Sequence, residues 1–164
     1  MKQIRLNVFE TNSSSSHSLT INNKTHINKN ELKIKNIYTY IDLCENYGWE
    51  EKSYSLWTDK LNYCLVSLWN YMPQDVIENT QGIVSDFFKA VDVIFSHQDF
   101  LDYIEYDEDR DLDYYINRFD GGIDHQSNEL IIDEYGKYQD GVQFFNDLIF
   151  GVNSVIETDN DNHY

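Results

Sequence analysis

The sequence has few cysteines, a single proline and few basic residues, and it contains no long apolar run. Its two cysteines, Cys44 and Cys64, are not in a CxxC pattern, which predicts reduced, buried thiols rather than a disulfide or a zinc site. No apolar run approaches the ~20 residues of a membrane span, and the first residues do not lead into the apolar segment of a signal peptide. We therefore expect a soluble cytoplasmic protein without a membrane partner.

The acidic residues greatly outnumber the basic ones and are unevenly distributed. Residues 1–41 contain six Lys and Arg against two acids, whereas residues 42–164 contain six Lys and Arg against 27 acids, and the formal net charge is −17. A field of this sign repels nucleic acid and attracts basic surfaces. The composition predicts no direct binding of nucleic acid and favours a basic, nucleic-acid-binding protein as partner; the alternative is that acidity only maintains solubility.

The hydrophobic patterns predict one α+β domain over residues 1–164. Alternating residues predict strands over Ile4–Phe9, Ser18–Ile21, 32–37 and 152–157. Spacings of three and four predict helices over 53–72, ended by Pro73, over 74–97 with a break near Gly82, and along 142–149; the 129–135 segment could be strand or helix. The expected fold is a small antiparallel sheet formed by both chain ends, packed on three to four central helices.

A run of polar residues separates the first two predicted strands. It is too long for an ordinary hairpin turn and has no Gly or Pro, but it holds a carboxylate, an amide, several hydroxyls and an imidazole between Phe9 and Leu19. Such a loop can be a flexible Ser-rich connection, or it can hold a fixed shape through hydrogen bonds of its side chains to the main chain.

The same run resembles the opening signature, F-E-T-N-S-S-S-S/T-H-S, of a family of small phage and prophage proteins of low-GC bacteria. The short segments Ile123–Ser127 and Asp159–Asn162 are similar to later parts of that family, whereas residues 24–120 carry no resemblance. The resemblance implies a phage setting and a shared polar site, without implying a particular reaction.

If these three polar segments meet at an edge of the sheet, they form a candidate site. The candidate catalytic residues are Ser14, His17, Asp124 and His125, and the surrounding polar cluster is Glu10, Asn12, Ser13, Ser127, Asp159, Asn160 and Asp161. A histidine oriented by an acid could activate a serine for acyl or phosphoryl transfer, the histidines and acids could bind a divalent metal, or the loop could cradle a phosphate. Alternatively, these groups hydrogen-bond one another and pin the chain ends together. No standard catalytic motif is present, so the metal and the cofactor stay unassigned.

A second candidate site is an acidic segment over residues 99–113 that is interleaved with aromatic residues. Its carboxylates are Asp99, Asp102, Glu105, Asp107, Glu108, Asp109, Asp111 and Asp113. A calcium loop is excluded because Leu112 and Arg118 replace the required Gly and Glu. Closely spaced carboxylates can imitate a nucleic-acid strand, although a solvated surface is the simpler interpretation.

These observations favour a phage accessory protein that inhibits a nucleoprotein complex of host defence, of the anti-CRISPR type, through its acidic segment. The alternatives are a small enzyme that uses the polar site on a nucleotide, a phosphorylated substrate or a host protein, and a phage scaffold protein that needs neither site.

Overall fold

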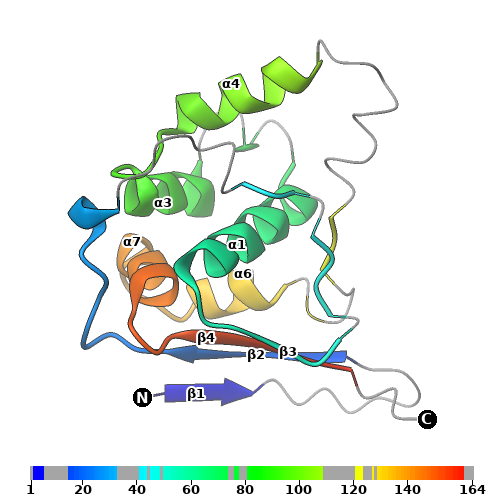
Figure 1. Ribbon diagram of the computed structural model, residues 1–164, viewed down its shortest axis with the longest axis vertical. Helices are drawn as coiled ribbons and strands as arrows, with labels where there is room; N and C mark the ends of the chain where they lie inside the picture. The colour runs from blue at the N-terminus through cyan, green and yellow to red at the C-terminus, as the bar shows by residue number, and fades with distance from the viewer. Residues whose placement is uncertain are drawn as a thin grey trace.

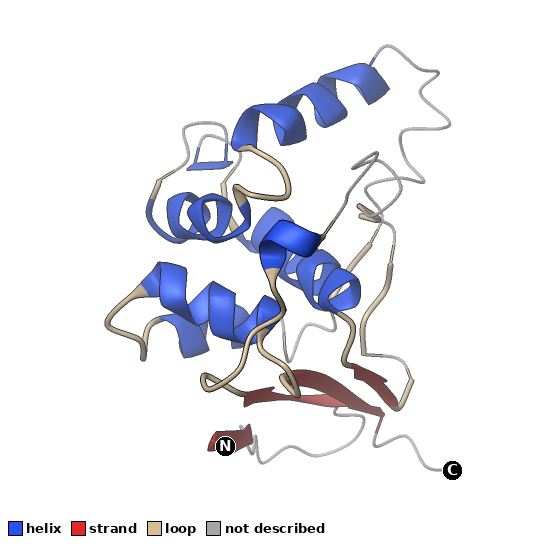
Figure 2. Cartoon of the chain, turned by 60° about the vertical axis from the view of Figure 1, so that its left-hand side comes forward, coloured by secondary structure: helices blue, strands red, loops and turns tan. Residues whose placement is uncertain are grey.

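The computed structural model confirms an α+β fold in which the helices lie on one side of a small sheet (Figure 1). It describes residues 2–5, 15–32, 41–43, 45–48, 50–73, 76–77, 81–108, 121–123, 127 and 129–160. In the view of Figure 2 the sheet again forms a single layer beneath the helices.

The sheet is antiparallel and has the strand order β1-β2-β4-β3. Its strands are β1 (Lys2–Arg5), β2 (Ser15–Ile21), β3 (Lys52–Tyr54) and β4 (Val155–Asn160). As predicted, the two central strands come from opposite ends of the described chain; in their register Leu19 pairs with Ile156. Leu19 and Ile156 are fully buried, and the more exposed Ser18 and Glu157 follow in alternation. Burial of one face fixes this register, because a slip by one residue would expose both apolar side chains.

Three of the predicted strands need correction. The strand predicted over 152–157 begins only at Val155, because residues 152 and 153 form a turn, and it continues to Asn160. β2 begins at Ser15 rather than Ser18, because β4 continues to Asn160 and supplies backbone partners for the last residues of the Ser-rich run. At the predicted 32–37 strand, Leu32 caps a short 3-10 helix, η1 (Lys29–Glu31), while residues 33–37 lie outside the described residues, as do residues 6–9 of the first predicted strand.

The first predicted helix, over 53–72, is confirmed from Trp57 onward, whereas Ser53 and Tyr54 belong to the strand β3. The second, over 74–97, is interrupted before Gly82, close to the predicted break. α1 (Trp57–Tyr71) ends before Pro73. Within the predicted 74–97 helix, α3 (Gly82–Val91) ends before residue 92, and a separate helix, α4 (His97–Glu108), begins at its last residue. His97 therefore begins a helix instead of ending one. Its Nε2 lies 2.8 Å from the carbonyl oxygen of Ile77, and its ring contacts Phe88.

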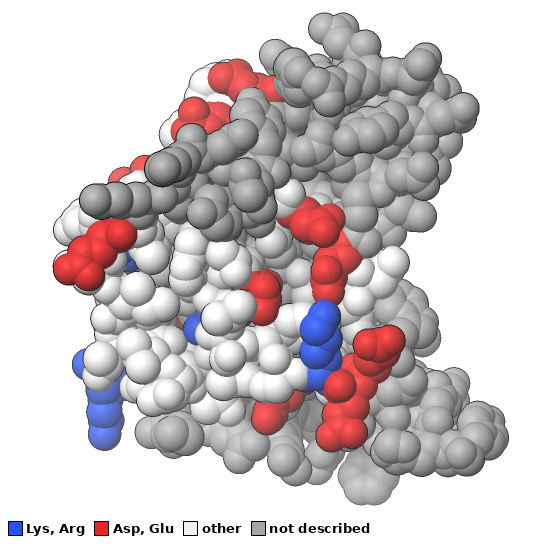
Figure 3. All heavy atoms as spheres, in the orientation of Figure 1, with Lys and Arg blue, Asp and Glu red and all other residues white. Residues whose placement is uncertain are grey.

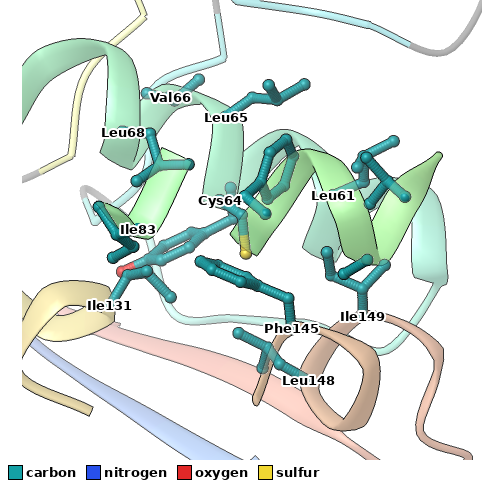
Figure 4. Close-up of a cluster of buried hydrophobic side chains, with 14 of the residues drawn as sticks. Leu61, Cys64, Leu65, Val66, Leu68, Ile83, Ile131, Phe145, Leu148 and Ile149 are labelled. Carbon is teal, nitrogen blue, oxygen red and sulfur yellow. The ribbon is translucent and has the colours of Figure 1, made fainter. Parts of the chain in front are cut away.

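Three short helices complete the layer above the sheet: α6 (Leu130–Tyr135), α7 (Gly141–Phe145) and a π-helix, η3 (Asn146–Phe150), that continues α7. α1 supplies much of the core, which it shares with α3, α6, α7 and η3 (Figure 4). Cys64 points into this apolar cluster, as predicted for a buried thiol, and burial raises its pKa. Among the described residues, no helix combines the length and apolar character that crossing a membrane requires.

A turn over residues 151–154 joins η3 to β4 and is tied to two distant elements. Lys60 of α1 is 1% exposed, and its ammonium donates to the carbonyl oxygens of Gly151 at 3.2 Å and Ser154 at 2.9 Å. The main-chain N–H of Asn22 donates to Ser154 Oγ at 2.8 Å. The turn thus connects α1, the segment after β2 and the start of β4, so the position of β4 depends on it.

Candidate functional site: a polar cluster and an acidic surface

The described parts of the three predicted polar segments lie together. In the β2–β4 ladder, Ser15 pairs with Asn160, Ser16 with Asp159 and His17 with Thr158. The main-chain N–H of His17 also donates to Ser127 Oγ at 3.2 Å, across 110 residues of sequence. This end of the ladder therefore brings residues from all three segments to one place.

The imidazole of His17 is directed inward, to α1. His17 is 3% exposed, and its Nδ1 lies 2.8 Å from the hydroxyl of Tyr63, whose side chain is fully buried. Burial raises the pKa of the Tyr63 hydroxyl well above its ordinary value, so the phenol stays neutral and can donate to the imidazole. These contacts attach β2 to α1, which is the role expected if the polar groups pin the chain ends.

Most of the other residues predicted for this site fall on parts of the chain that are not described. Glu10, Asn12, Ser13, Ser14, Asp124, His125 and Asp161 lie outside the described residues. Asp159 and Asn160 are placed by the backbone of β4, and Ser127 is a buried acceptor. The proposed nucleophile and its acid therefore stay predictions.

The acidic segment begins as a helix. Asp99, Asp102, Glu105, Asp107 and Glu108 belong to α4, while Asp109, Asp111 and Asp113 lie outside the described residues. Phe100 is 2% exposed and contacts Trp69 and Phe88, so it anchors the helix to the core. Asp99 and Asp102 are exposed, and acidic side chains gather over the α4 region of the surface in Figure 3. We call α4 and its carboxylates the acidic surface.

Asp99 also caps α4. Its carboxylate accepts hydrogen bonds from the main-chain N–H and the hydroxyl of Ser96, both at 2.7 Å, and the Ser96 hydroxyl accepts from the N–H of Asp99 at 3.1 Å. The hydrogen bonds from Ser96 hold the pKa of Asp99 below its ordinary value. The pattern Ser-x-x-Asp is a known helix-start signal, so the start of α4 at this point can be read from the sequence. Asp99 thus has a structural role at the start of α4.

One acid–histidine pair was missed because its members are 121 residues apart. His26 Nε2 lies 2.7 Å from Asp147 Oδ1, which also accepts from Gln143 Nε2 at 2.6 Å. Asp147 belongs to η3 and its side chain is 2% exposed, whereas that of His26 is 33% exposed. A buried carboxylate that orients an accessible imidazole can support general-base chemistry. Backbone hydrogen bonds on both sides of the pair, from Ile27 to Phe150 and from Val152 to Thr25, show that it also joins two chain segments.

Within the described residues, no group of three or more His, Cys, Asp or Glu side chains is placed to hold a metal ion. Comparisons of this chain with protein families, with curated proteins and with solved structures found no match.

Proposed function

We propose that this is a phage-encoded accessory protein that inhibits a host defence nucleoprotein complex by binding the basic channel meant for nucleic acid. The observation that supports this proposal is α4, a helix with five carboxylate residues and no Lys or Arg among its twelve residues. Phe100 fixes the helix on the core, and Asp99 and Asp102 on either side of it in the sequence are exposed.

The charge of the whole chain supports the same proposal. A net charge of −17 creates a long-range field that accelerates the encounter with a basic surface and repels free nucleic acid. Salt screens this field over about 8–10 Å at physiological ionic strength, so the interaction should weaken as salt is raised. The partner is therefore a basic nucleic-acid-binding protein or complex, and not DNA or RNA itself.

The test neutralises three carboxylate residues of α4 and keeps Asp99, because loss of the cap would disturb the helix itself. The test variant combines Asp102→Asn, Glu105→Gln and Glu108→Gln. Negative side chains near the C-terminus of a helix interact unfavourably with the negative end of the helix dipole. Removing them should therefore leave the helix and the fold intact. A matched control with the same change of net charge combines Glu51→Gln, Asp133→Asn and Glu157→Gln, three exposed positions outside α4.

The wild type should capture a nucleic-acid-binding complex from host lysate at about 50 mM salt and release it at about 500 mM. It should also displace labelled DNA or RNA from that complex. The test variant should lose displacement by about tenfold or more, while the control keeps most of it, because only charges aligned with the channel replace phosphates. Equal displacement by both variants would contradict the acidic-surface mechanism.

The second candidate function is that of an enzyme at the polar cluster, and the convergence of β2, Ser127 and β4 supports it. The chemistry would be acyl or phosphoryl transfer by a Ser14 hydroxyl activated by His125, since the His17 imidazole is directed inward to Tyr63. Turnover of p-nitrophenyl acetate or p-nitrophenyl phosphate, abolished by Ser14→Ala and by Asp124→Asn in folded protein, would favour this function. Turnover unchanged in both variants would exclude the proposed residues.

A further inference from the structure

A pocket of about 420 Å³ opens beside the edge strand β3. It adjoins the polar cluster, because Lys52 pairs with Thr158, the β4 partner of His17, and it lies at the opposite end of the molecule from α4 (Figure 1). Its volume is within the range of small-ligand sites, about 300–1,000 Å³. The described residues that line it are Glu45, Asn46, Gly48, Glu50, Lys52 and Tyr54. In Figure 3 a basic side chain stands between acidic ones in the area over β3.

The pocket already holds a positive group of the protein itself. Lys52 Nζ lies 3.1 Å from Glu45 Oε1 and 4.8 Å from the centre of the Tyr54 ring. The hydrogen bond to Glu45 is the main reason that the pKa of Lys52 is raised. A carboxylate and an aromatic ring thus stabilise one cation from two sides, and Glu50 adds a second carboxylate to the lining.

The cation in the pocket is exchangeable while the wall behind it is fixed. The side chains of Lys52 and Glu45 are 49% and 36% exposed, and an ion pair this accessible to water is weak. By contrast, the N–H of Tyr47 donates to the Gly122 carbonyl at 2.7 Å, and the Thr158 hydroxyl donates to the Glu50 carbonyl at 2.6 Å. A ligand can therefore displace the Lys52 ammonium without rebuilding the pocket.

We propose that this pocket binds a guanidinium group, which replaces the Lys52 ammonium between Glu45 and Tyr54. Two carboxylates against one ammonium give the lining a net negative charge, which disfavours an anionic ligand. A guanidinium is planar, so it can donate two parallel hydrogen bonds to the Glu45 carboxylate while its face lies on the Tyr54 ring. An ammonium offers only a point charge, so arginine should bind better than lysine. The inference is independent of the acidic surface on α4.

The probe is N-acetyl-arginine methylamide, titrated into the ¹⁵N-labelled full chain and followed by the backbone amide signals of residues 45–54. The isosteric citrulline derivative, which is neutral, should cause no shift. Lys52→Ala should tighten binding of the arginine probe by about threefold because it removes the competing cation, and Glu45→Gln should weaken it by at least about fivefold. The matched control, Lys89→Ala, removes a similarly paired exposed lysine on α3 and should leave the affinity unchanged.

The source of the guanidinium is distinguished by a third titration with free L-arginine. Its carboxylate would meet the acidic lining, so weaker binding than that of the capped probe indicates an arginine side chain of a partner protein. If free L-arginine binds more strongly than the capped probe, the natural ligand is a small metabolite that contains a guanidinium group. Equal shifts with the citrulline derivative, an unchanged affinity in Glu45→Gln, or no shift up to about 50 mM probe would overturn the proposal.

Discussion

Replacing Gly151 with alanine is expected to destabilise the protein by about 3 kcal/mol or more. A Cβ at this position would lie closer than 3.0 Å to the carbonyl oxygens of Asp147 and Asn22 and to Ser154 Oγ. Two of these atoms belong to the backbone, of η3 and of the segment after β2, and cannot rotate away. The methyl group would therefore push apart the turn that joins η3 to β4.

Urea unfolding followed by fluorescence measures this effect, and Gly136→Ala is the matched control. At position 136 the added Cβ would meet only the carbonyl oxygens of Ile132 and Asp133, at 3.5 and 3.6 Å, which are ordinary contacts. That substitution should change stability by no more than about 1 kcal/mol, because it mainly reduces the freedom of the unfolded chain. Equal midpoints for both variants would show that the turn tolerates a side chain and that β4 is not held as tightly as its contacts indicate.

The parts of the fold that were predicted correctly are those in which one side chain pattern repeats over several residues. Leu61, Leu65 and Leu68 recur at helical spacing and are buried on α1, while Leu19 and Ile21 alternate with polar residues on β2. The placement of both chain ends in one sheet followed from the same alternation. In these elements the spacing of the apolar residues along the sequence is enough to identify the face that packs against the core.

The elements that the sequence did not predict depend on contacts between distant segments. β3 has only three residues, and its strand conformation comes from pairing with β4. The π-helix at Asn146–Phe150 has the same apolar spacing as an α-helix, so its extra residue per turn cannot be read from the sequence. The His26–Asp147 pair is formed only when the segment after β2 meets that helix.

In the candidate sites, too, the grouping of segments was predicted from the sequence, whereas contacts between distant side chains were not. The Ser-rich run and the segments containing Ser127 and Asp159 were grouped on their resemblance to a known signature, and the described backbone brings them together. The inward direction of the His17 imidazole could not be predicted, because it depends on the position of Tyr63 on α1. The pocket at β3 was missed because Glu45, Lys52 and Tyr54 appear in sequence as an ordinary polar segment.

Replacing Lys60 with alanine is expected to lower the free energy of unfolding by about 2–4 kcal/mol. Lys60 is buried in α1, and its ammonium donates to the carbonyl oxygens of Gly151 and Ser154. Alanine removes both hydrogen bonds and leaves the volume of the side chain empty. Lys60→Met keeps a similar volume and removes a charge that is costly to bury, so its loss should be smaller, at about 1–2 kcal/mol. Urea unfolding of the two variants at pH 7 separates the contribution of side-chain packing to stability from the contribution of the ammonium and its hydrogen bonds.

The buried ammonium also predicts how stability depends on pH. Burial lowers the pKa of Lys60 from 10.5 to about 8, so between these values the unfolded chain binds more protons than the folded protein. The free energy of unfolding contributed by Lys60 therefore rises with pH, by about 1 kcal/mol between pH 7 and pH 9. Above pH 9 the Cys64 thiol acts in the opposite direction, because burial raises its pKa and only the unfolded chain ionises there.

The difference in stability between the wild type and Lys60→Met isolates this contribution, since both proteins contain the same thiol and the same tyrosines. The wild type should gain about 1 kcal/mol relative to the variant as the pH rises from 7 to 9. If the free energies of unfolding of the two proteins changed equally with pH, the Lys60 ammonium would be as well stabilised in the folded protein as in water. The carbonyl oxygens of the 151–154 turn would then hold a charged group at no cost, and the turn would be a stronger cation site than its two contacts with Lys60 indicate.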